Sequence, residues 1–186
     1  MSIEILSRDR QYDGRSIHVE KVHFRMPNGK EPTYDLVVHP GAVVILPVDG
    51  AGNVLFVKQF RLGAGCELLE LPAGVLEAGE EPIETARREV REETGLAAAE
   101  IVPLGEFWLT PGYSTEYLYI FLARDLSSAP LEQDDDELIE LVKIPLEQAY
   151  QMAATGGIKD GKTLAALFLA TVGLYAEEGG VEEPEE

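Results

Sequence analysis

The sequence predicts an α+β fold dominated by strands, with a small antiparallel β domain at the N-terminus. Apolar and β-branched runs separated by turn signals recur along residues 1–145, whereas helical patterning is confined to three segments. A hydrophobic content of 45% in 186 residues is enough to build a core, which excludes a globally disordered chain. A chain of this length suits one principal domain with a small appendage.

Residues 1–40 are expected to form the N-terminal β domain. Alternating apolar residues predict strands at residues 16–24 and 33–39, and the segment between them, Pro27-Asn28-Gly29-Lys30, is typical of a turn. The dipeptide Pro40-Gly41 then interrupts the strand pattern. We therefore place a domain boundary at residue 40.

Residues 41–176 are expected to form the larger domain, followed by an acidic, disordered tail at residues 177–186. Its first helix starts at Pro82, which suits the first helical position, and stops at Gly95, which favours a left-handed C-terminal cap. Strands are predicted at residues 42–48, 54–60, 67–71, 101–109, 116–122 and 138–144, and helices at residues 82–95, 146–154 and 162–177.

Composition excludes several classes of function. A net charge of -19 argues against a nucleic-acid partner and against docking on anionic membranes, because both need clustered Lys and Arg. The most apolar late stretch, residues 164–175, is too short to span a bilayer, so we expect no membrane association. The single cysteine, Cys66, excludes an internal disulfide and fits a reducing compartment, which favours a cytoplasmic location.

The most informative segment is the first predicted helix. Ile83 and Val90 lie on an apolar stripe, and Glu89, Glu92 and Glu93 follow an adjacent stripe at i, i+3 and i+4. Like charges at this spacing repel, and no cation occupies the i±3 or i±4 positions around Glu89. Two interpretations stay open from spacing alone. The stripe is either a solvated charged face or a site for a hard divalent cation, which prefers clustered carboxylates.

The same segment carries a longer motif. It fits the pattern G-x5-E-x7-R-E-U-x-E-E-x-G-U, in which U is aliphatic, and it resembles the signature of the Nudix hydrolases. That resemblance implies a Nudix fold, with mixed β-sheets sandwiched between helices (α/β/α). The motif positions are Gly74, Glu80, Arg88, Glu89, Val90, Glu92, Glu93, Gly95 and Leu96.

The resemblance also implies a chemistry, the hydrolysis of a nucleoside diphosphate linked to another group. Glu89, Glu92 and Glu93, together with the backbone carbonyl of Ala73, would hold Mg²⁺, for which Mn²⁺ substitutes. The cation would neutralise the diphosphate and activate water. The remaining motif residues would support this loop and helix without taking part in the chemistry; they are Gly74, Glu80, Arg88 and Gly95.

Further features are similar to the ADP-ribose pyrophosphatase branch of the family. Residues 67–74 read ELLELPAG, and Pro111 follows Gly95 at a distance associated with ADP-ribose hydrolysis. Arg61 occupies the place of an arginine that reaches the diphosphate through its planar fork of donors. The reaction implied is cleavage of ADP-ribose to AMP and ribose 5-phosphate.

The N-terminal segment resembles the domain through which family members form homodimers. Tyr34 falls where an aromatic ring stacks on adenine, and Asp35 falls where an acid contacts the base. A strand tyrosine packs equally well against a core, so both interpretations of Tyr34 stay open. Glu116, in the sequence TPGYSTE, is a further candidate for the substrate site.

A second acidic cluster, DDDE at residues 134–137, is expected to lend acids to the site. The resemblance implies that Glu137 is a general base or an extra metal ligand, with Asp135 in the place of a second glutamate. Because aspartate is shorter than glutamate, the identity of the general base is left open among Glu137, Asp135 and Glu93. Glu92 is the fourth residue expected to take part in catalysis. The alternative interpretation is a soluble acidic turn.

Two rival functions use the same motif. One is hydrolysis of a GDP- or UDP-sugar, since a tyrosine stacks on any base. The other is a regulator that binds a nucleotide sugar without turnover, although every carboxylate of the motif is present. Removal of pyrophosphate from RNA 5′ ends is disfavoured by the net charge of -19.

Overall fold

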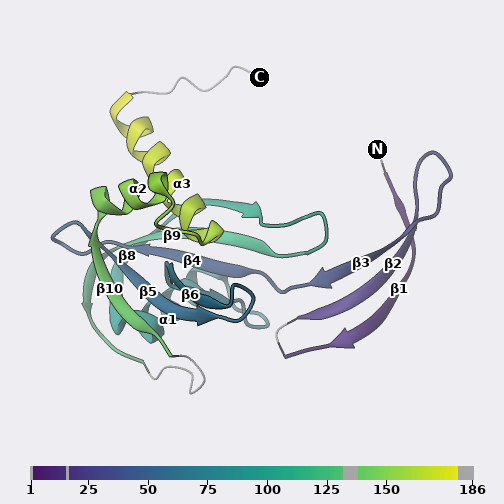
Figure 1. Ribbon diagram of the computed structural model, residues 1–186, viewed down its shortest axis with the longest axis horizontal. Coiled ribbons are helices and arrows are strands. Elements are labelled where there is room, and N and C mark those ends of the chain that lie inside the picture. Colours follow the sequence, from purple (N-terminus) through teal and green to yellow (C-terminus); the bar gives the residue numbers. More distant parts are fainter. Residues whose placement is uncertain (1, 16, 132–137, 180–186) are drawn as a thin grey trace.

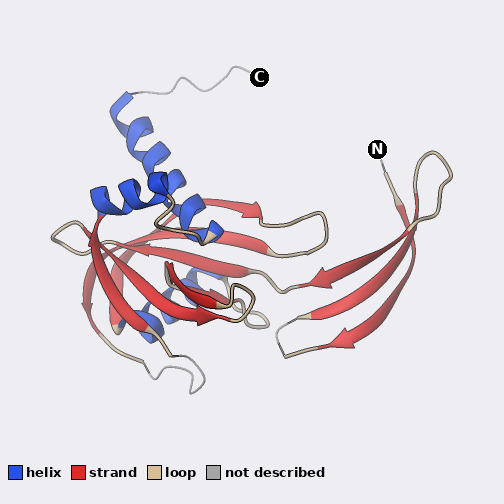
Figure 2. Cartoon of the chain, in the orientation of Figure 1, coloured by secondary structure: helices blue, strands red, loops and turns tan. Residues whose placement is uncertain are grey.

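The computed structural model describes residues 2–15, 17–131 and 138–179, which form a β-rich body and a separate N-terminal sheet (Figures 1 and 2). The N-terminal sheet projects from the body, and its last strand leads into the body through a short connection. The elements are β1 (Glu4–Asp13), β2 (His18–Arg25), β3 (Thr33–Val38), β4 (Ala42–Pro47), β5 (Asn53–Arg61), β6 (Cys66–Glu70), β7 (Ala73–Val75), α1 (Pro82–Thr94), β8 (Leu96–Trp108), β9 (Tyr117–Ser128), β10 (Glu140–Pro145), α2 (Leu146–Thr155) and α3 (Gly161–Gly179).

The N-terminal sheet is antiparallel in the order β1–β2–β3. β2 and β3 occupy the two predicted segments, and in the turn between them Gly29 adopts a φ of +81° while its N–H donates to Met26 O at 2.9 Å. Sequence patterning did not predict β1. Nearly all of its side chains are exposed, so no apolar alternation marks it as a strand.

The body contains two sheets. β10–β5–β6 is antiparallel, whereas β7–β4–β9–β8 is mixed because β4 runs parallel to β9, with Val44 opposite Ile120. β8 and β9 extend further than predicted and pair as one long hairpin, with an irregular register between Pro103 and Gly105. β7 has only three residues, too few for the sequence to show an alternation.

β4 divides the core in two because successive side chains of a strand point to opposite faces. Val44 packs with Phe56 of β5 and Leu167 of α3 on one face, whereas Val43 packs with Val90 of α1 on the other. Helices therefore cover both sides of the sheets, which confirms the predicted α/β/α arrangement. Within the described residues, none of the helices is long and apolar enough to cross a membrane.

α1 has the predicted start and end. Pro82 is its first residue, and Gly95 adopts a φ of +72° as the C-terminal cap, with its N–H donating to Arg91 O at 2.9 Å. Ala86 and Val90 are fully buried against the sheet. Burial of a valine side chain contributes roughly 1.5–3 kcal/mol. The apolar stripe therefore determines which face of α1 packs on the sheet and which face is left for the carboxylates.

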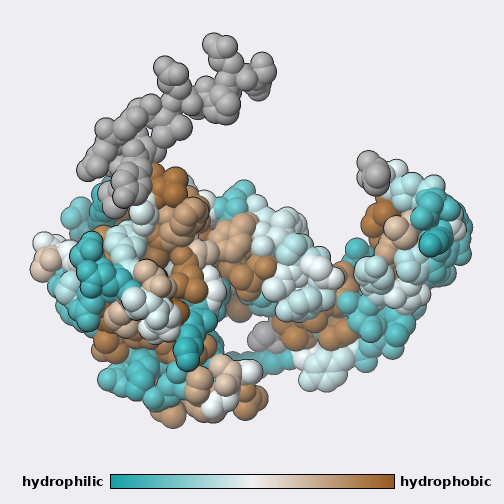
Figure 3. All heavy atoms as spheres, turned by 45° about the horizontal axis from the view of Figure 1, so that its top comes forward, coloured by the Kyte–Doolittle hydropathy of each residue, from teal (hydrophilic) through white to brown (hydrophobic). Residues whose placement is uncertain are grey.

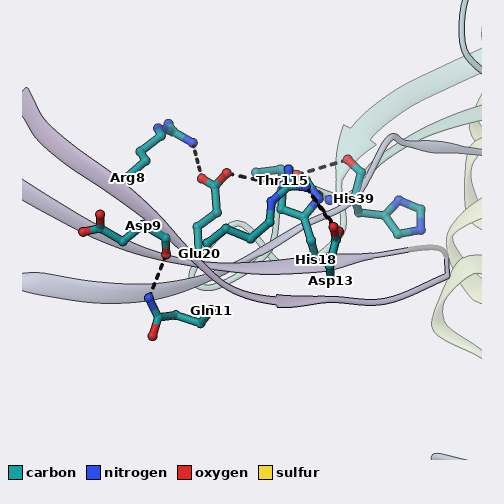
Figure 4. Close-up of polar contacts among 9 residues, drawn as sticks. Arg8, Asp9, Gln11, Asp13, His18, Glu20, His39 and Thr115 are labelled. Atoms are coloured by element: carbon teal, nitrogen blue, oxygen red, sulfur yellow. Dashed lines mark hydrogen bonds and ion pairs between the residues drawn. The ribbon is translucent and has the colours of Figure 1, made fainter.

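A short contact ties the end of β3 to the turn between β8 and β9. Val37 N–H donates to Tyr113 O at 2.8 Å, and Thr115 N–H donates to Val37 O at 2.9 Å. Thr115 Oγ1 also donates to His39 O at 3.1 Å, as Figure 4 shows. The turn is therefore fixed against the strand that leaves the N-terminal sheet.

Within the N-terminal sheet, the same figure shows Glu20 of β2 paired with Arg8 of β1 at 3.0 Å.

Gly74 lies where β7 meets α1, and it has no room for a side chain. A Cβ at this position would coincide with the Cγ, Cδ and Oε1 atoms of Glu89. The glycine therefore lets the Glu89 side chain fold over the backbone of β7. Its role in this fold is the close approach of helix and strand, since its φ is not in the left-handed region.

We expect Gly74→Ala to displace Glu89 and destabilise the protein, because overpacking costs typically about 1–3 kcal/mol. The free energy of unfolding in urea should fall by about that amount. Gly50→Ala is the matched control, since nothing lies within 4 Å of a Cβ there, and its effect should stay within about 0.5 kcal/mol. Equal stability of the two variants would contradict this account of Gly74.

Candidate active site

The predicted carboxylates lie on the face of α1 that borders β7. Glu93 is 4% exposed, and its Oε2 accepts the backbone N–H of Ala73 at 3.1 Å. Glu89 is also buried, against Gly74, and Glu92 is partly exposed on the next turn. The three glutamates thus lie on one face of α1, as their spacing predicts, and the fold brings Ala73, which only the resemblance implied, to the same corner of the body.

Arg88 binds three of the acidic side chains at this corner. It donates to Glu80 from Nε at 3.2 Å and from Nη2 at 3.1 Å, while Nη1 donates to Glu89 at 2.6 Å and to Glu92 at 2.9 Å. Burial alone would lower the pKa of Arg88, but these carboxylates raise it above its usual value. Hydrogen bonds from Arg88 in turn lower the pKa of Glu80. The loop before α1 and the helix are therefore joined by one guanidinium.

The donor set fits a hard divalent cation in kind, because carboxylate and carbonyl oxygens are its preferred ligands. Among the described residues, no group of three His, Cys, Asp or Glu side chains is arranged to hold a metal ion. In this conformation Arg88 Nη1 lies between Glu89 and Glu92 and donates a hydrogen bond to each. A cation that uses both glutamates has to replace Arg88 there. The ligand assignment stays a prediction.

Arg61, the predicted diphosphate contact, ends β5 and forms a two-point ion pair. Its Nε donates to Glu70 Oε1 at 2.8 Å, and its Nη2 donates to Glu70 Oε2 at 2.7 Å. These hydrogen bonds raise the pKa of Arg61 against the opposing effect of burial, and the negative charge of Glu93 adds to the rise. Arg61 therefore lies within electrostatic reach of one carboxylate of α1, that of Glu93.

The residues that support Arg61 are not predicted by the sequence. Glu70 is 1% exposed, and Lys162 from the start of α3 approaches its Oε2 at 3.5 Å. Lys162 also binds Asp160 at 2.7 Å, and Asp160 accepts the N–H and the hydroxyl of Thr163. One signal was available: Asp160 precedes Thr163 by three residues, the spacing of a helix N-terminal cap. Nothing in the sequence indicates that this cap faces Glu70.

Pro111 and Glu116 lie at the turn between β8 and β9. Pro111 is exposed within a turn closed by N–H donation from Tyr113 to Thr110 O at 3.1 Å. Burial lowers the pKa of His39, and the negative charge of Glu116 opposes that shift, so Glu116 lies close to His39. Both predicted residues therefore border the junction with the N-terminal sheet.

Tyr34 and Asp35 lie on β3 in the projecting sheet, away from α1 (Figure 1). Tyr34 is 60% exposed and packs edge-on against Phe24, with ring centroids 5.2 Å apart, and Asp35 pairs with Lys21 at 3.2 Å. One chain does not bring these two residues beside Glu93. A role in substrate binding therefore requires a second copy of the chain.

The other two acids predicted for the site, Asp135 and Glu137, lie outside the described residues. The described residues on either side of them border a cleft of about 420 Å³ that opens beside the carboxylates of α1. Its walls combine acidic and apolar side chains, which suits a ligand with charged and uncharged parts. The residues that border it are Glu92, Glu93, Thr94, Gly95, Pro130, Leu131, Ile139 and Leu141.

Known proteins resemble this chain over most of its length. A model of the NUDIX domain matches residues 38–167. The chain is 37% identical to the ADP-ribose pyrophosphatase of Bacillus subtilis (strain 168), covering 87% of this chain and 89% of that protein. It is 36% identical to the GDP-mannose pyrophosphatase of Yersinia enterocolitica, covering 71% of this chain and 73% of that protein.

A solved structure supports the same relationship. The crystal structure of an ADP compounds hydrolase superposes with a TM-score of 0.84 at 26% sequence identity, covering 97% of this chain and 98% of that chain. Members of the matched family generally need divalent metal ions. The signature around α1, the match to the domain model and these relatives agree, and the chain belongs to the Nudix hydrolase family, in its ADP-ribose pyrophosphatase branch.

Proposed function

We propose that the protein hydrolyses the diphosphate of ADP-ribose, with AMP and ribose 5-phosphate as products. The observation that carries this proposal is the position of Arg61, within electrostatic reach of Glu93. An anionic diphosphate needs both a guanidinium donor and a site for cations. The name of the Bacillus subtilis relative favours ADP-ribose as the molecule that supplies the diphosphate.

Each residue of the corner has a distinct part in this proposal. Arg61 binds the diphosphate, while Glu89, Glu92 and Glu93, with the carbonyl of Ala73, hold Mg²⁺ or Mn²⁺. The chemistry that a bound divalent cation supplies is neutralisation of the diphosphate and acidification of the attacking water. Arg88 and Glu80 keep the loop in place against α1.

Hydrolysis also requires an acceptor for the proton of the attacking water. Glu93 is a candidate because the N–H of Ala73 fixes its carboxylate. Asp135 and Glu137, which lie outside the described residues, are the other candidates that the resemblance to the family implies. The water oxygen forms a bond to one phosphorus, and the bridging P–O bond breaks.

GDP-mannose is the second candidate substrate. The Yersinia enterocolitica relative is a GDP-mannose pyrophosphatase, and it matches the chain at nearly the same identity as the Bacillus subtilis protein. The diphosphate contacts proposed for Arg61 serve either substrate, because they do not touch the base. Contacts to the base and to the terminal sugar therefore decide between the two.

A panel of nucleotide sugars with and without Mg²⁺ tests the proposed substrate. ADP-ribose should give the highest kcat/KM, with AMP and ribose 5-phosphate identified by chromatography, and chelation of metal should abolish turnover. GDP-mannose and UDP-glucose are the comparison substrates, because each has a diphosphate with a different base and a different terminal sugar. Equal or faster turnover of GDP-mannose would overturn the assignment of ADP-ribose.

We also propose that residues 1–40 form a dimerisation domain that brings Tyr34 and Asp35 to the site of a second copy. Directly paired residues share one face of a sheet, and the pairs Ile5–Phe24 and Val22–Tyr34 therefore place four apolar side chains together. Ile5 is 44% exposed and Tyr34 is 60% exposed. Figure 3 shows hydrophobic residues at the surface of this unit. A three-stranded sheet with an uncovered apolar face favours a partner.

Light scattering with size-exclusion chromatography tests the dimer. The wild-type protein should elute with the mass of two chains, and Ile5→Asp should elute as a monomer because it places a charge in the apolar face. Thr33→Asp is the control, since Thr33 pairs with His23 on the opposite face of the sheet. A wild-type monomer, or a dimer that survives Ile5→Asp, would contradict the proposal.

A cytoplasmic location is proposed on the basis of the single cysteine. Cys66 is exposed and free. An exposed thiol of this kind suits a reducing compartment, in which it stays unoxidised.

A further inference from the structure

Glu70 is an unusual residue for the end of a strand. Its side chain is 1% exposed, yet it carries a carboxylate that contacts two cations, Arg61 and Lys162. Burial of a charge is costly unless the charge is paired, and here the pairing is geometrically specific. Both carboxylate oxygens bind Arg61, and Oε2 is shared with Lys162. The arrangement holds the guanidinium in a fixed orientation.

The second cation is itself held in place. Lys162 Nζ binds Asp160 Oδ1 at 2.7 Å, and the other oxygen of Asp160 caps α3 through the N–H of Thr163 at 2.9 Å. Thr163 Oγ1 accepts the N–H of Leu71 at 2.8 Å, which joins the start of α3 to the residue after Glu70. Burial would raise the pKa of Asp160, but Lys162 and Thr163 lower it. The start of α3 is therefore anchored beside Glu70 by two separate contacts.

We infer that Glu70 and Lys162 are positioning residues that aim Arg61 at the diphosphate of the substrate. The inference rests on the proposed function, because it gives Arg61 the diphosphate as its ligand. Glu70 binds Nε and Nη2, and no hydrogen bond within the described residues involves Nη1. Nη1 is thereby the nitrogen available to phosphate. The side chain of Arg61 is 40% exposed, so a ligand reaches it from solvent.

Lys162 matters because of the charge balance of the group. Arg61, Lys162, Glu70 and Asp160 together carry no net charge, so the group does not repel an anion. Without Lys162 the same group has a net negative charge, and the carboxylate of Glu70 is then compensated by Arg61 alone. An anionic diphosphate is therefore expected to bind less tightly.

Lys162→Met tests the inference by a split between KM and kcat. We expect KM to rise about tenfold with kcat changed by less than about threefold, because the loss falls on substrate binding. Lys143→Met is the matched control: it removes the same charge from a pair with Asp49 at 3.4 Å on an exposed part of β10, and its KM should equal that of wild type. Lys162→Arg, which keeps the charge, should restore most of the affinity.

A double-mutant cycle with Arg61→Ala separates positioning from simple stabilisation. In the Arg61→Ala background the effect of Lys162→Met on KM should disappear, since no guanidinium is left to aim. The fold should tolerate Arg61→Ala, because Glu70 keeps Lys162 as a partner. Thermal unfolding of every variant is measured alongside. A KM for Lys162→Met equal to that of Lys143→Met, or an undiminished effect without Arg61, would overturn the inference.

The cycle is run on whichever nucleotide sugar the wild-type protein hydrolyses fastest, so failure of the ADP-ribose assignment leaves this test intact. Calorimetric binding of the methylene-bridged, non-hydrolysable analogue of ADP-ribose gives a second readout that needs no turnover. Its Kd should follow the same pattern across the variants. Suppose that the wild-type protein hydrolyses nucleotide sugars of the panel, but Arg61→Ala binds the analogue with the same Kd as the wild type. The positioning role is then wrong, while the hydrolase assignment stands.

Discussion

The site depends on one electrostatic constraint, the collection of like charges on a single face of α1. Glu89, Glu92 and Glu93 repel one another at their helical spacing, and the apolar stripe that contains Val90 prevents the helix from turning them to solvent. Arg88 relieves part of this repulsion and also holds Glu80 of the preceding loop. The loop, the helix and β7 are therefore organised around a cluster of acids, which is the proposed cation site.

Two arginines serve this cluster in different ways. Arg88 is surrounded by carboxylates of its own motif, and its guanidinium partly neutralises their negative charge. Arg61 lies on β5, in the other sheet of the body, and its side chain is ion-paired with Glu70. It is partly exposed to solvent and lies within electrostatic reach of Glu93. In the proposed function, a cation would have to replace the first arginine at Glu89 and Glu92, whereas the second would bind the anionic diphosphate. β5 brings Arg61 within electrostatic reach of Glu93, although β5 and α1 pack on opposite faces of β4.

The parts that sequence predicted are those encoded by local signals. Pro82, Gly95 and the apolar stripe determine α1, and the carboxylates follow from its period. β1 escaped prediction because it is exposed on both faces. The contact between Glu70 and Lys162 escaped it for a different reason: the two residues are distant in sequence, and only the tertiary structure brings the start of α3 to the end of β6. A resemblance supplied the role of Arg61, but its partner came from tertiary structure alone.

The central claim, that the carboxylates of α1 are a cation site, is tested most directly by Mn²⁺ binding followed by electron paramagnetic resonance. Glu93→Gln should raise the Kd for Mn²⁺ about tenfold or more, equivalent to about 1.4 kcal/mol. Glu84→Gln is the control, because it removes the same charge from an exposed position in the first turn of the same helix. Equal Mn²⁺ affinity in the two variants would contradict the claim.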